Sequence, residues 1–212
     1  MWKAGDRMKV AVLASGRGSN FEALAKAAQD ESYPAIIVLL VTDNPEARAL
    51  EVAKKFGIES FVVDCGSKKG SMTPESSEKI ASLCRERGVE LVCLAGFMRI
   101  VKGRLLEEYK GRMINIHPAL LPSFKGLHGQ RQALEYGVKY SGCTVHFVDE
   151  GVDTGPIIIQ RVVPVLQDDD EETLSARILK EEHIAYPEAV RLIAEGRVRI
   201  KGRRVFIDER KN

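Results

Sequence analysis

The chain has 212 residues, of which 44% are hydrophobic, and its 32 Lys and Arg residues against 30 Asp and Glu residues give a net charge of +2. This length and apolar content suit one folded domain with a sizeable core and exclude a disordered chain. The near balance of charge argues against a nucleic-acid partner, and because no apolar run approaches about 20 residues we expect a cytoplasmic protein without a membrane partner.

The first half of the chain alternates strand and helix patterns. Short apolar runs predict buried strands at residues 9–14, 35–41, 61–63, 91–95 and 113–116. Helical patterns separate most of these runs, which predicts a Rossmann-like α/β fold, a mostly parallel sheet with helices on both faces. Ligands of such sheets bind beyond the carboxyl ends of the strands. We therefore expect the residues that follow strands at Gly16, Gly96 and His117 to converge.

The pattern changes after His117. Helices are predicted at residues 130–136 and 172–195, the second with a kink or a restart at Pro187. Strands are predicted at 143–147 and 157–163, and a terminal hairpin at 197–206. The C-terminal part should therefore add antiparallel strands and a long helix to the sheet. Residues 1–7 are expected to be an extension before a single domain, residues 8–212.

A glycine-rich loop, Gly16-Arg17-Gly18-Ser19-Asn20, follows the first predicted strand and opens a helix. Its glycines let the backbone approach an anion, and the helix N-terminus supplies N–H groups and a favourable dipole. Phe21 stands where a dinucleotide-binding fingerprint has its third glycine, so the loop suits a single phosphate. A turn that needs glycine only for its own geometry is the alternative. Asp43, after the second strand, is explained equally well as a ribose ligand and by turn and capping chemistry.

The candidate catalytic residues lie in two short polar segments between apolar runs. Asn115 and His117 end one apolar strand, where alternation places both side chains on one face, and Asp153 precedes another apolar run. An amide and an imidazole can donate to a developing oxyanion, and a carboxylate can orient the imidazole and accept a proton. These are the parts of an acyl-transfer site. Taken singly, His117 could be a core histidine and Asp153 a turn residue.

The other polar features carry weaker predictions. His128 lies in a glycine-rich loop, and His146 alternates with Val145 and Phe147, which places it on the opposite sheet face from those two. The acidic run 168–172 is explained better by a solvated helix N-terminus than by a metal site. The four cysteines form no C-x-x-C pair, so we expect neither zinc nor disulfides. The basic C-terminal hairpin is explained better as a protected sheet edge than as an RNA contact.

Together these residues closely resemble the phosphoribosylglycinamide formyltransferases, which are folate-dependent enzymes of purine biosynthesis. The resemblance runs from about residue 8 to residue 193 and rests on the motifs at residues 15–20, 94–100, 115–122, 142–148 and 153–156. The chain departs from the family in three places. Residues 66–74 lack a Ser-Arg-type segment that would contact the folate tail, Gln130 replaces a second histidine of some relatives, and Leu179 replaces a glutamine.

The resemblance implies a role for each candidate residue. The catalytic residues would be Asn115, His117 and Asp153. Glycinamide ribonucleotide would bind through its phosphate to Gly18, Ser19 and Asn20, with Glu182 near the ribose. The folate pocket would be lined by Met98, Arg99, Ile100, Val101, Asp149, Glu150, Gly151 and Val152. Residues 8–110 would form the phosphate- and nucleotide-binding half, and residues 111–212 the catalytic and folate-binding half.

The resemblance also implies the reaction and its participants. The co-substrate is 10-formyltetrahydrofolate, no metal is required, and the protein is a monomer or a homodimer. The glycinamide amine attacks the formyl carbon, Asn115 and His117 donate to the oxyanion, and Asp153 keeps His117 in its donating form.

Three alternative functions share part of this pattern. A 10-formyltetrahydrofolate hydrolase would use the same residues on water, but such hydrolases carry an N-terminal regulatory domain that residues 1–7 are not expected to supply. A methionyl-tRNA formyltransferase would add a C-terminal tRNA-binding domain, for which we expect no room. A nucleotide-binding module without catalysis would use only the glycine-rich loop.

Overall fold

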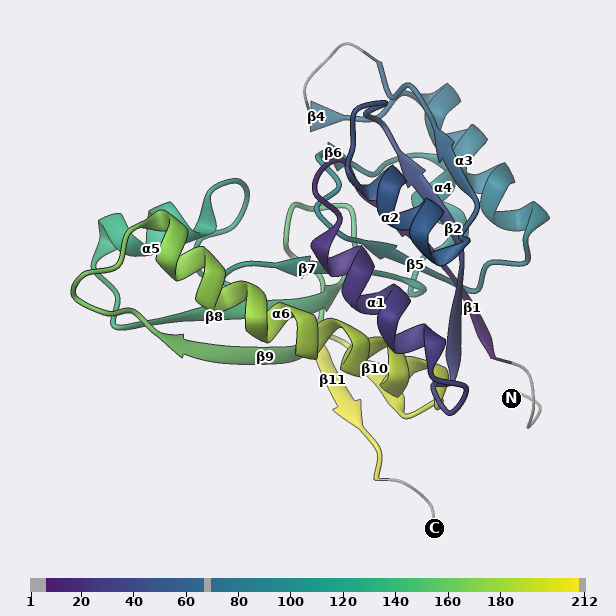
Figure 1. Cartoon of the computed structure of the whole chain (residues 1–212). Coiled ribbons are helices and arrows are strands. Elements are labelled where there is room, and N and C mark those ends of the chain that lie inside the picture. Colours follow the sequence, from purple (N-terminus) through teal and green to yellow (C-terminus); the bar gives the residue numbers. More distant parts are fainter. Residues whose placement is uncertain (1–6, 67–69, 210–212) are drawn as a thin grey trace.

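A mostly parallel sheet runs through the centre of the molecule (Figure 1). The computed structural model describes residues 7–66 and 70–209. Residues 1–6 of the expected extension and 67–69 of the departing stretch 66–74 lie outside the described residues. Within the described part, seven strands form the main sheet: β1 (Met8–Leu13), β2 (Ala35–Thr42), β3 (Ser60–Val62), β5 (Leu91–Leu94), β7 (Met113–His117), β8 (Tyr140–Phe147) and β9 (Ile157–Pro164).

The strand order is β3-β2-β1-β5-β7-β8-β9, and the direction of pairing changes at β7. The strands from β3 to β7 pair in parallel, whereas β8 runs antiparallel to β7, and β9 antiparallel to β8. The predicted fold class, a parallel sheet extended by antiparallel strands toward the C-terminus, is therefore confirmed. β7 is the one strand of this sheet, as the structure describes it, with a parallel neighbour on one side and an antiparallel neighbour on the other.

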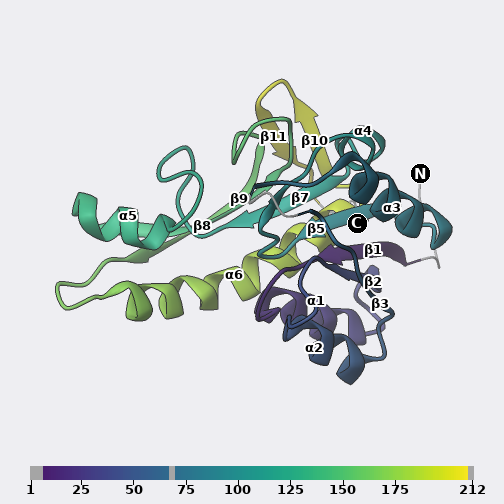
Figure 2. The same ribbon diagram turned by 90° about the horizontal axis from the view of Figure 1, so that it is seen from above.

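Helices cover both faces of the sheet (Figure 2). One face carries α1 (Ser19–Gln29), α2 (Ala49–Phe56) and α6 (Glu171–Ala194), and the other carries α3 (Pro74–Glu86) and α4 (Arg104–Glu108). The burial of β1 shows why its sequence is a continuous apolar run. Val10 and Val12 pack into the first apolar cluster, whereas Ala11 and Leu13 pack into the second, so both faces of the strand are shielded.

The long helix α6 begins with the acidic run. Asp170 accepts a hydrogen bond from the Thr173 N–H, the Thr173 hydroxyl oxygen accepts one from the Asp170 N–H, and Asp169 pairs with Arg177. These carboxylates therefore cap and stabilise the first turn, as favourable dipole interactions predict. The helix continues through Pro187, so of the two predicted outcomes, a kink or a restart, the restart is wrong. Its shielded apolar face, which includes Ile178 and Tyr186, holds the helix together.

Three smaller elements complete the described chain. α5 (Gly129–Tyr136) packs near α6, and the predicted terminal hairpin is formed by β10 (Val198–Lys201) and β11 (Arg204–Ile207). A two-stranded parallel pair joins β4 (Gly70–Ser71) to β6 (Arg99–Ile100). At the tip of the hairpin, Arg203 donates to the Thr154 carbonyl at 2.7 Å, so the hairpin is fastened to the loop after β8.

Candidate active site

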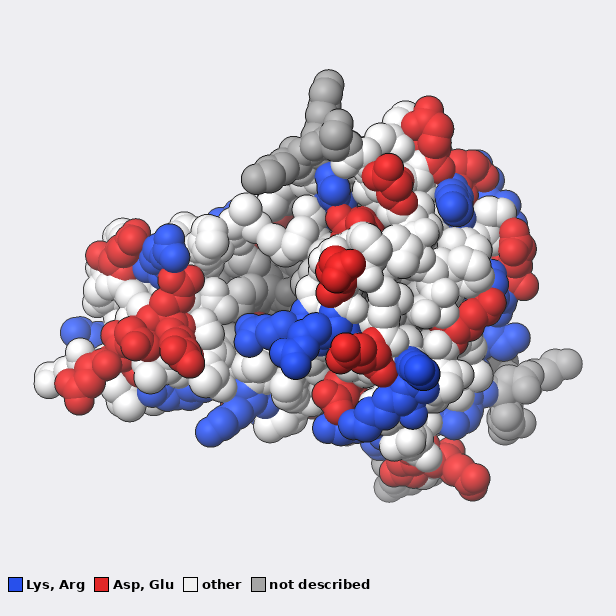
Figure 3. Space-filling model, turned by 45° about the horizontal axis from the view of Figure 1, so that its top comes forward, with Lys and Arg blue, Asp and Glu red and all other residues white. Residues whose placement is uncertain are grey.

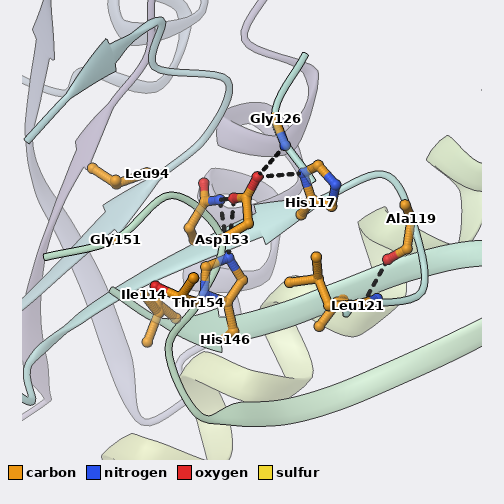
Figure 4. A network of polar contacts seen from close by, with 12 residues as sticks. Leu94, Ile114, His117, Ala119, Leu121, Gly126, His146, Gly151, Asp153 and Thr154 are labelled. Atoms are coloured by element: carbon orange, nitrogen blue, oxygen red, sulfur yellow. Dashed lines mark hydrogen bonds and ion pairs between the residues drawn. The ribbon is translucent and has the colours of Figure 1, made fainter. Parts of the chain in front are cut away.

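The candidate catalytic residues meet on one face of β7 (Figure 4). Asn115 and His117 are two residues apart on β7, so their side chains share a face, and the apolar Ile114 and Ile116 point into the cluster on the other. Asp153 comes from the loop between β8 and β9. That loop starts beside the amino end of β7, where the Val148 N–H donates to the Met113 carbonyl, and folds back to reach the polar face.

Asp153 is the centre of the polar network. Its Oδ2 lies 3.3 Å from Nδ1 of His117 and accepts from the Gly126 N–H at 2.8 Å. Its Oδ1 accepts from Nδ2 of Asn115 at 3.4 Å and lies 3.5 Å from Nε2 of His146. The side chains of Asp153 and His117 are only 10% and 5% exposed. The structure thus brings the three predicted residues together and adds His146 to them.

The His117 ring has its single proton on Nε2. Nε2 lies 2.8 Å from the Phe124 carbonyl, which can only accept, so Nε2 donates and Nδ1 of the neutral ring is a bare acceptor. Burial lowers the pKa of His117, against the opposing pull of Asp153. Nδ1 and the Asp153 carboxylate therefore face one another as two acceptors, and the Nε2 hydrogen is held by Phe124. This arrangement differs from the expected role of His117 as a donor to an oxyanion. A proton delivered between Nδ1 and the carboxylate would be stabilised by both groups, which makes the pair a proton-accepting site.

Asp153 stays ionised in this setting. Burial opposes its charged form, but the Gly126 N–H and the attraction of a protonated His117 ring favour it, and the pKa of Asp153 lies below its ordinary value. Its backbone is in the left-handed region at φ 51°, which a non-glycine residue rarely adopts. The tight loop around it imposes this conformation, since a Cβ on Gly155 would lie 1.7 Å from the Phe147 carbonyl oxygen.

His146 orients the amide of Asn115. The two residues are directly opposite one another in the antiparallel pairing of β7 and β8. Nδ1 of His146 lies 2.8 Å from the Phe147 carbonyl and must donate to it, so Nε2 is the acceptor for Nδ2 of Asn115 at 3.2 Å. The alternation in the sequence predicts its sheet face correctly. Its place opposite Asn115 needed the register of β7 and β8, which strand alternation alone does not supply.

A pocket of about 670 Å³ lies across the end of β7 from this network. It is lined by the glycine-rich loop, by Ile116 and Pro118 on either side of His117, and by Gln130, Leu179 and Glu182. Figure 3 shows a hollow left of the centre of this face, with a mostly acidic group of side chains to its left and both basic and acidic side chains to its right. The pocket and the polar network of Asp153 therefore lie on opposite faces of β7 and meet at its carboxyl end.

The glycine-rich loop ends in a helix N-terminus without a side-chain cap. Gly18 is in the left-handed region at φ 74°, and a Cβ there would lie 2.9 Å from Cα of Ala49, so only glycine fits. Nδ2 of Asn20 donates to Oε2 of Glu182 at 2.7 Å, while the buried Oδ1 of Asn20 has no hydrogen-bond partner. Burial raises the pKa of Glu182. The structure thus groups Gly18, Ser19, Asn20 and Glu182 around one pocket.

The residues predicted for folate follow two strands that flank β7. Met98 is 57% exposed, Arg99 and Ile100 form β6, and Val101 is buried in the apolar cluster on the α3 side. In the second segment, Asp149 shapes the loop by accepting from the Gly151 N–H and the Thr154 hydroxyl, while Glu150, Gly151 and Val152 are exposed. Val101 and Val148, which precedes the second segment, belong to the same apolar cluster as Met113 on the Asn115 side of β7, and neither segment lines the pocket of the glycine-rich loop.

The remaining histidines stand apart from the network. His128 is exposed, and its Nδ1 lies 3.9 Å from Glu171. His183 lies against α1, where burial lowers its pKa. Among residues 7–66 and 70–209, no group of three or more His, Cys, Asp or Glu side chains has metal-binding geometry. No helix in the same described part has the length and apolar character to span a membrane.

The fold and this network define an α/β protein equipped for acyl-transfer chemistry. The formyl transferase family model matches residues 8–190. The phosphoribosylglycinamide formyltransferase of Bacillus subtilis is 45% identical over 86% of this chain and 93% of its own length. The crystal structure of glycinamide ribonucleotide transformylase 1 from Symbiobacterium toebii superposes with a TM-score of 0.92 at 45% identity, covering 99% of this chain and 98% of that one.

A further relative is a larger protein. The trifunctional purine biosynthetic protein adenosine-3 of Drosophila melanogaster is 48% identical over 90% of this chain, but the match spans only 14% of that protein's length. The three relatives agree with the family model. The chain belongs to the formyl transferase family.

Proposed function

We propose that this protein transfers the formyl group of 10-formyltetrahydrofolate to the amine of glycinamide ribonucleotide, in purine biosynthesis. The observation that carries the proposal is the grouping of Asn115, His117 and Asp153 on β7, at whose carboxyl end the pocket of the glycine-rich loop opens. Relatives that bear the transferase name and match nearly their whole length support it.

The ribonucleotide would occupy the pocket on the α1 side of β7. Its phosphate would take the uncapped N–H groups of Ser19 and Asn20, where Gly18 allows close approach. Glu182, held by Asn20, would accept from a ribose hydroxyl, and the unpartnered Oδ1 of Asn20 would gain a donor. The glycinamide arm would then extend past Ile116 and Pro118 to the end of β7.

Formyl-folate would approach from the other face of β7. Residues 98–101 and 149–152 would line its site, so that the formyl carbon lies beside Asn115, His117 and Asp153. In this arrangement residues 8–110 supply the phosphate loop and one folate segment. Residues 111–212 supply the catalytic residues, the second folate segment and Glu182. The protein itself needs no metal in this reaction, because the donors and the proton acceptor are side chains.

The chemistry follows from the protonation of the network. The amine nitrogen bonds to the formyl carbon, the carbonyl electrons move to oxygen, and Asn115, oriented by His146, turns to that oxyanion the Nδ2 hydrogen that Asp153 accepts at 3.4 Å in the free protein. The proton of the attacking nitrogen passes to Nδ1 of His117, where Asp153 stabilises it 3.3 Å away. The ring then donates from Nδ1 as well as from Nε2. Return of the proton to N10 of the folate releases the product as the C–N10 bond breaks.

A spectrophotometric assay with 10-formyl-dideazafolate, with and without glycinamide ribonucleotide, tests the proposal. We expect deformylation that depends strictly on the ribonucleotide and yields one formylated ribonucleotide for each folate product. Deformylation that ignores the ribonucleotide would show a hydrolase in which water takes the place of the amine. Binding of both compounds without turnover would show a module without catalysis, and would refute the assignment of the three residues.

A further inference from the structure

A buried polar cluster joins the loops that we assign to different substrates. Ser15 follows β1, donates from Oγ to Oδ1 of Asp43 at 2.5 Å, and accepts from the Met98 N–H at 2.9 Å. Oδ2 of Asp43 accepts from Nε of Arg99 at 2.7 Å. The side chains of Asp43 and Arg99 are 7% and 18% exposed. A continuous path of hydrogen bonds therefore runs from the start of the glycine-rich loop to residues 98–101.

Ser15 is itself fixed to the backbone around it. Its N–H donates to the Gly96 carbonyl at 3.1 Å, and its carbonyl accepts from Nδ2 of Asn44 at 3.2 Å. The carboxyl ends of β1 and β5 are thereby joined by main-chain and side-chain bonds at one residue. A displacement of Ser15 would therefore also displace Met98, because the Ser15 hydroxyl accepts a hydrogen bond from the Met98 N–H.

A contribution to the stability of the fold does not by itself explain why this polar cluster is buried. Removing an aspartate and an arginine from water costs free energy that their attraction only partly returns, and apolar replacements are often equally stable. The groups that Asp43 fixes are the guanidinium of Arg99 and, through Ser15, the N–H of Met98. Both belong to the segment that borders the polar face of β7. The free-energy cost of burying these two charges is explained if folate binding requires residues 98–101 to be held in a fixed position.

We propose that Asp43 is a positioning residue for the formyl-folate site, and that Ser15 ties this site to the glycine-rich loop; this inference rests on the proposed function. Asp43 does not touch either substrate. It holds residues 98–101 in place before the folate arrives, so less conformational freedom is lost on binding. Because Ser15 connects residues 98–101 to the glycine-rich loop, binding of either substrate should also raise the affinity for the other.

The substitution Asp43→Asn tests the inference. Asparagine keeps an oxygen for the Ser15 hydroxyl, but its amide nitrogen cannot accept from Nε of Arg99, so one arm of the cluster is cut. Calorimetric titration with 10-formyl-dideazafolate should show Kd raised about tenfold, which equals about 1.4 kcal/mol. Kd for glycinamide ribonucleotide should change less than about twofold, and kcat at saturation less than about threefold.

Glu59→Gln is the matched control. Arg87 is 19% exposed, close to the 18% of Arg99, and its Nε donates to Oε2 of Glu59 at 2.6 Å. Glu59 directly precedes β3, the edge strand beside β2, and Arg87 follows α3, so neither residue belongs to a proposed substrate loop. The substitution removes one charge from a pair whose arginine is as shielded as Arg99 but whose carboxylate is 53% exposed, against 7% for Asp43. We expect neither Kd to change, although the melting temperature of both variants should fall slightly.

Ser15→Ala cuts the other arm and gives a readout that needs no substrate. It leaves the Asp43–Arg99 pair in place but removes the acceptor of the Met98 N–H, so amide hydrogen exchange across residues 96–101 should accelerate in the ligand-free protein. Asp43→Asn should accelerate it as well, and Glu59→Gln should not. If Asp43→Asn does not fold, Ser15→Ala carries the same test of folate affinity.

The outcomes separate this inference from the proposed function. Unchanged folate affinity in both cluster variants, or an equal loss of affinity for both substrates, would overturn the positioning role. An unmodified protein that binds ribonucleotide and formyl-folate without transferring the formyl group would refute the proposed function instead. Hydrogen exchange and folate affinity would still decide in that case whether Asp43 orders residues 98–101.

Discussion

The substitution Asp153→Asn tests the central claim, that the Asp153 carboxylate stabilises a proton on His117 during the reaction. Asparagine has nearly the same size, and it tolerates the left-handed backbone at φ 51° better than most residues. Its oxygen can still accept from the Gly126 N–H. The change therefore removes the negative charge and keeps the conformation of the loop.

The magnitude follows from the distance between the two groups. At 3.3 Å from Nδ1 to Oδ2, a carboxylate attracts an imidazolium by about 5 kcal/mol at an effective dielectric constant of about 20. The ground-state ring is neutral, so this attraction is present in full only after the proton arrives, and its loss raises the activation barrier. Because about 1.36 kcal/mol of activation free energy changes the rate tenfold, we expect kcat to fall about a thousand- to ten-thousand-fold with KM nearly unchanged.

Steady-state kinetics with both substrates varied gives the two constants, and thermal melting checks the fold. Asp153→Ala provides the contrast, because alanine removes the charge and also the polar side chain that suits the left-handed backbone. We expect it to melt at a lower temperature than Asp153→Asn at a similar kcat. A kcat within tenfold of the unmodified protein, or a loss confined to KM, would show that Asp153 does not stabilise charge in the transition state.

Three further predictions address other parts of the site. His146→Phe removes the acceptor that orients the Asn115 amide; kcat should fall about tenfold or more, and an unchanged kcat in steady-state assays would refute the orienting role. Gly18→Ala forces a Cβ to within 2.9 Å of Ala49 at φ 74°, so thermal melting should show a loss of about 1–3 kcal/mol, with a raised KM for the ribonucleotide. Burial lowers the pKa of His117, so the unfolded chain takes up its proton first as the pH falls. Stability is then fully present above about pH 6.5 and declines below it, and urea titrations of His117→Gln should show a smaller decline if this histidine contributes.

The sequence predicts the parallel half of the fold well because each strand there is buried on both faces. Val10 and Val12 face one apolar cluster and Ala11 and Leu13 the other, so the run is apolar throughout and its length marks a strand. The rule that ligands lie beyond the carboxyl ends of such strands correctly indicates where the glycine-rich loop opens its pocket. Pro187 is a case in which local sequence is a poorer guide. Proline weakens helices locally and so predicts a kink or a restart, but burial of the apolar face keeps α6 continuous.

The parts of the site that sequence reasoning missed depend on pairing that leaves no local pattern. His146 reaches Asn115 only through the register of β7 and β8, and Phe124 reaches His117 only through the course of a loop. Asp43 is a further example. Its position in Asp43-Asn44-Pro45 is fully explained by turn chemistry, yet it bonds Ser15 and Arg99, which are distant in sequence. Periodicity predicts which face a side chain takes, but not which side chain of another segment it meets.

The change in strand direction at β7 explains how the two proposed substrate sites come together there. Parallel strands place the loops that leave their carboxyl ends at one edge of the sheet, where the glycine-rich loop and residues 98–101 both lie. The antiparallel strand β8 instead starts its outgoing loop at the amino end of β7, and the folded-back course of that loop carries Asp153 over the polar face to Asn115 and His117. The candidate catalytic carboxylate therefore comes from the antiparallel part and the glycine-rich loop from the parallel part. β7 separates the two sides and carries on its own polar face the amide and the imidazole that we propose both substrates reach.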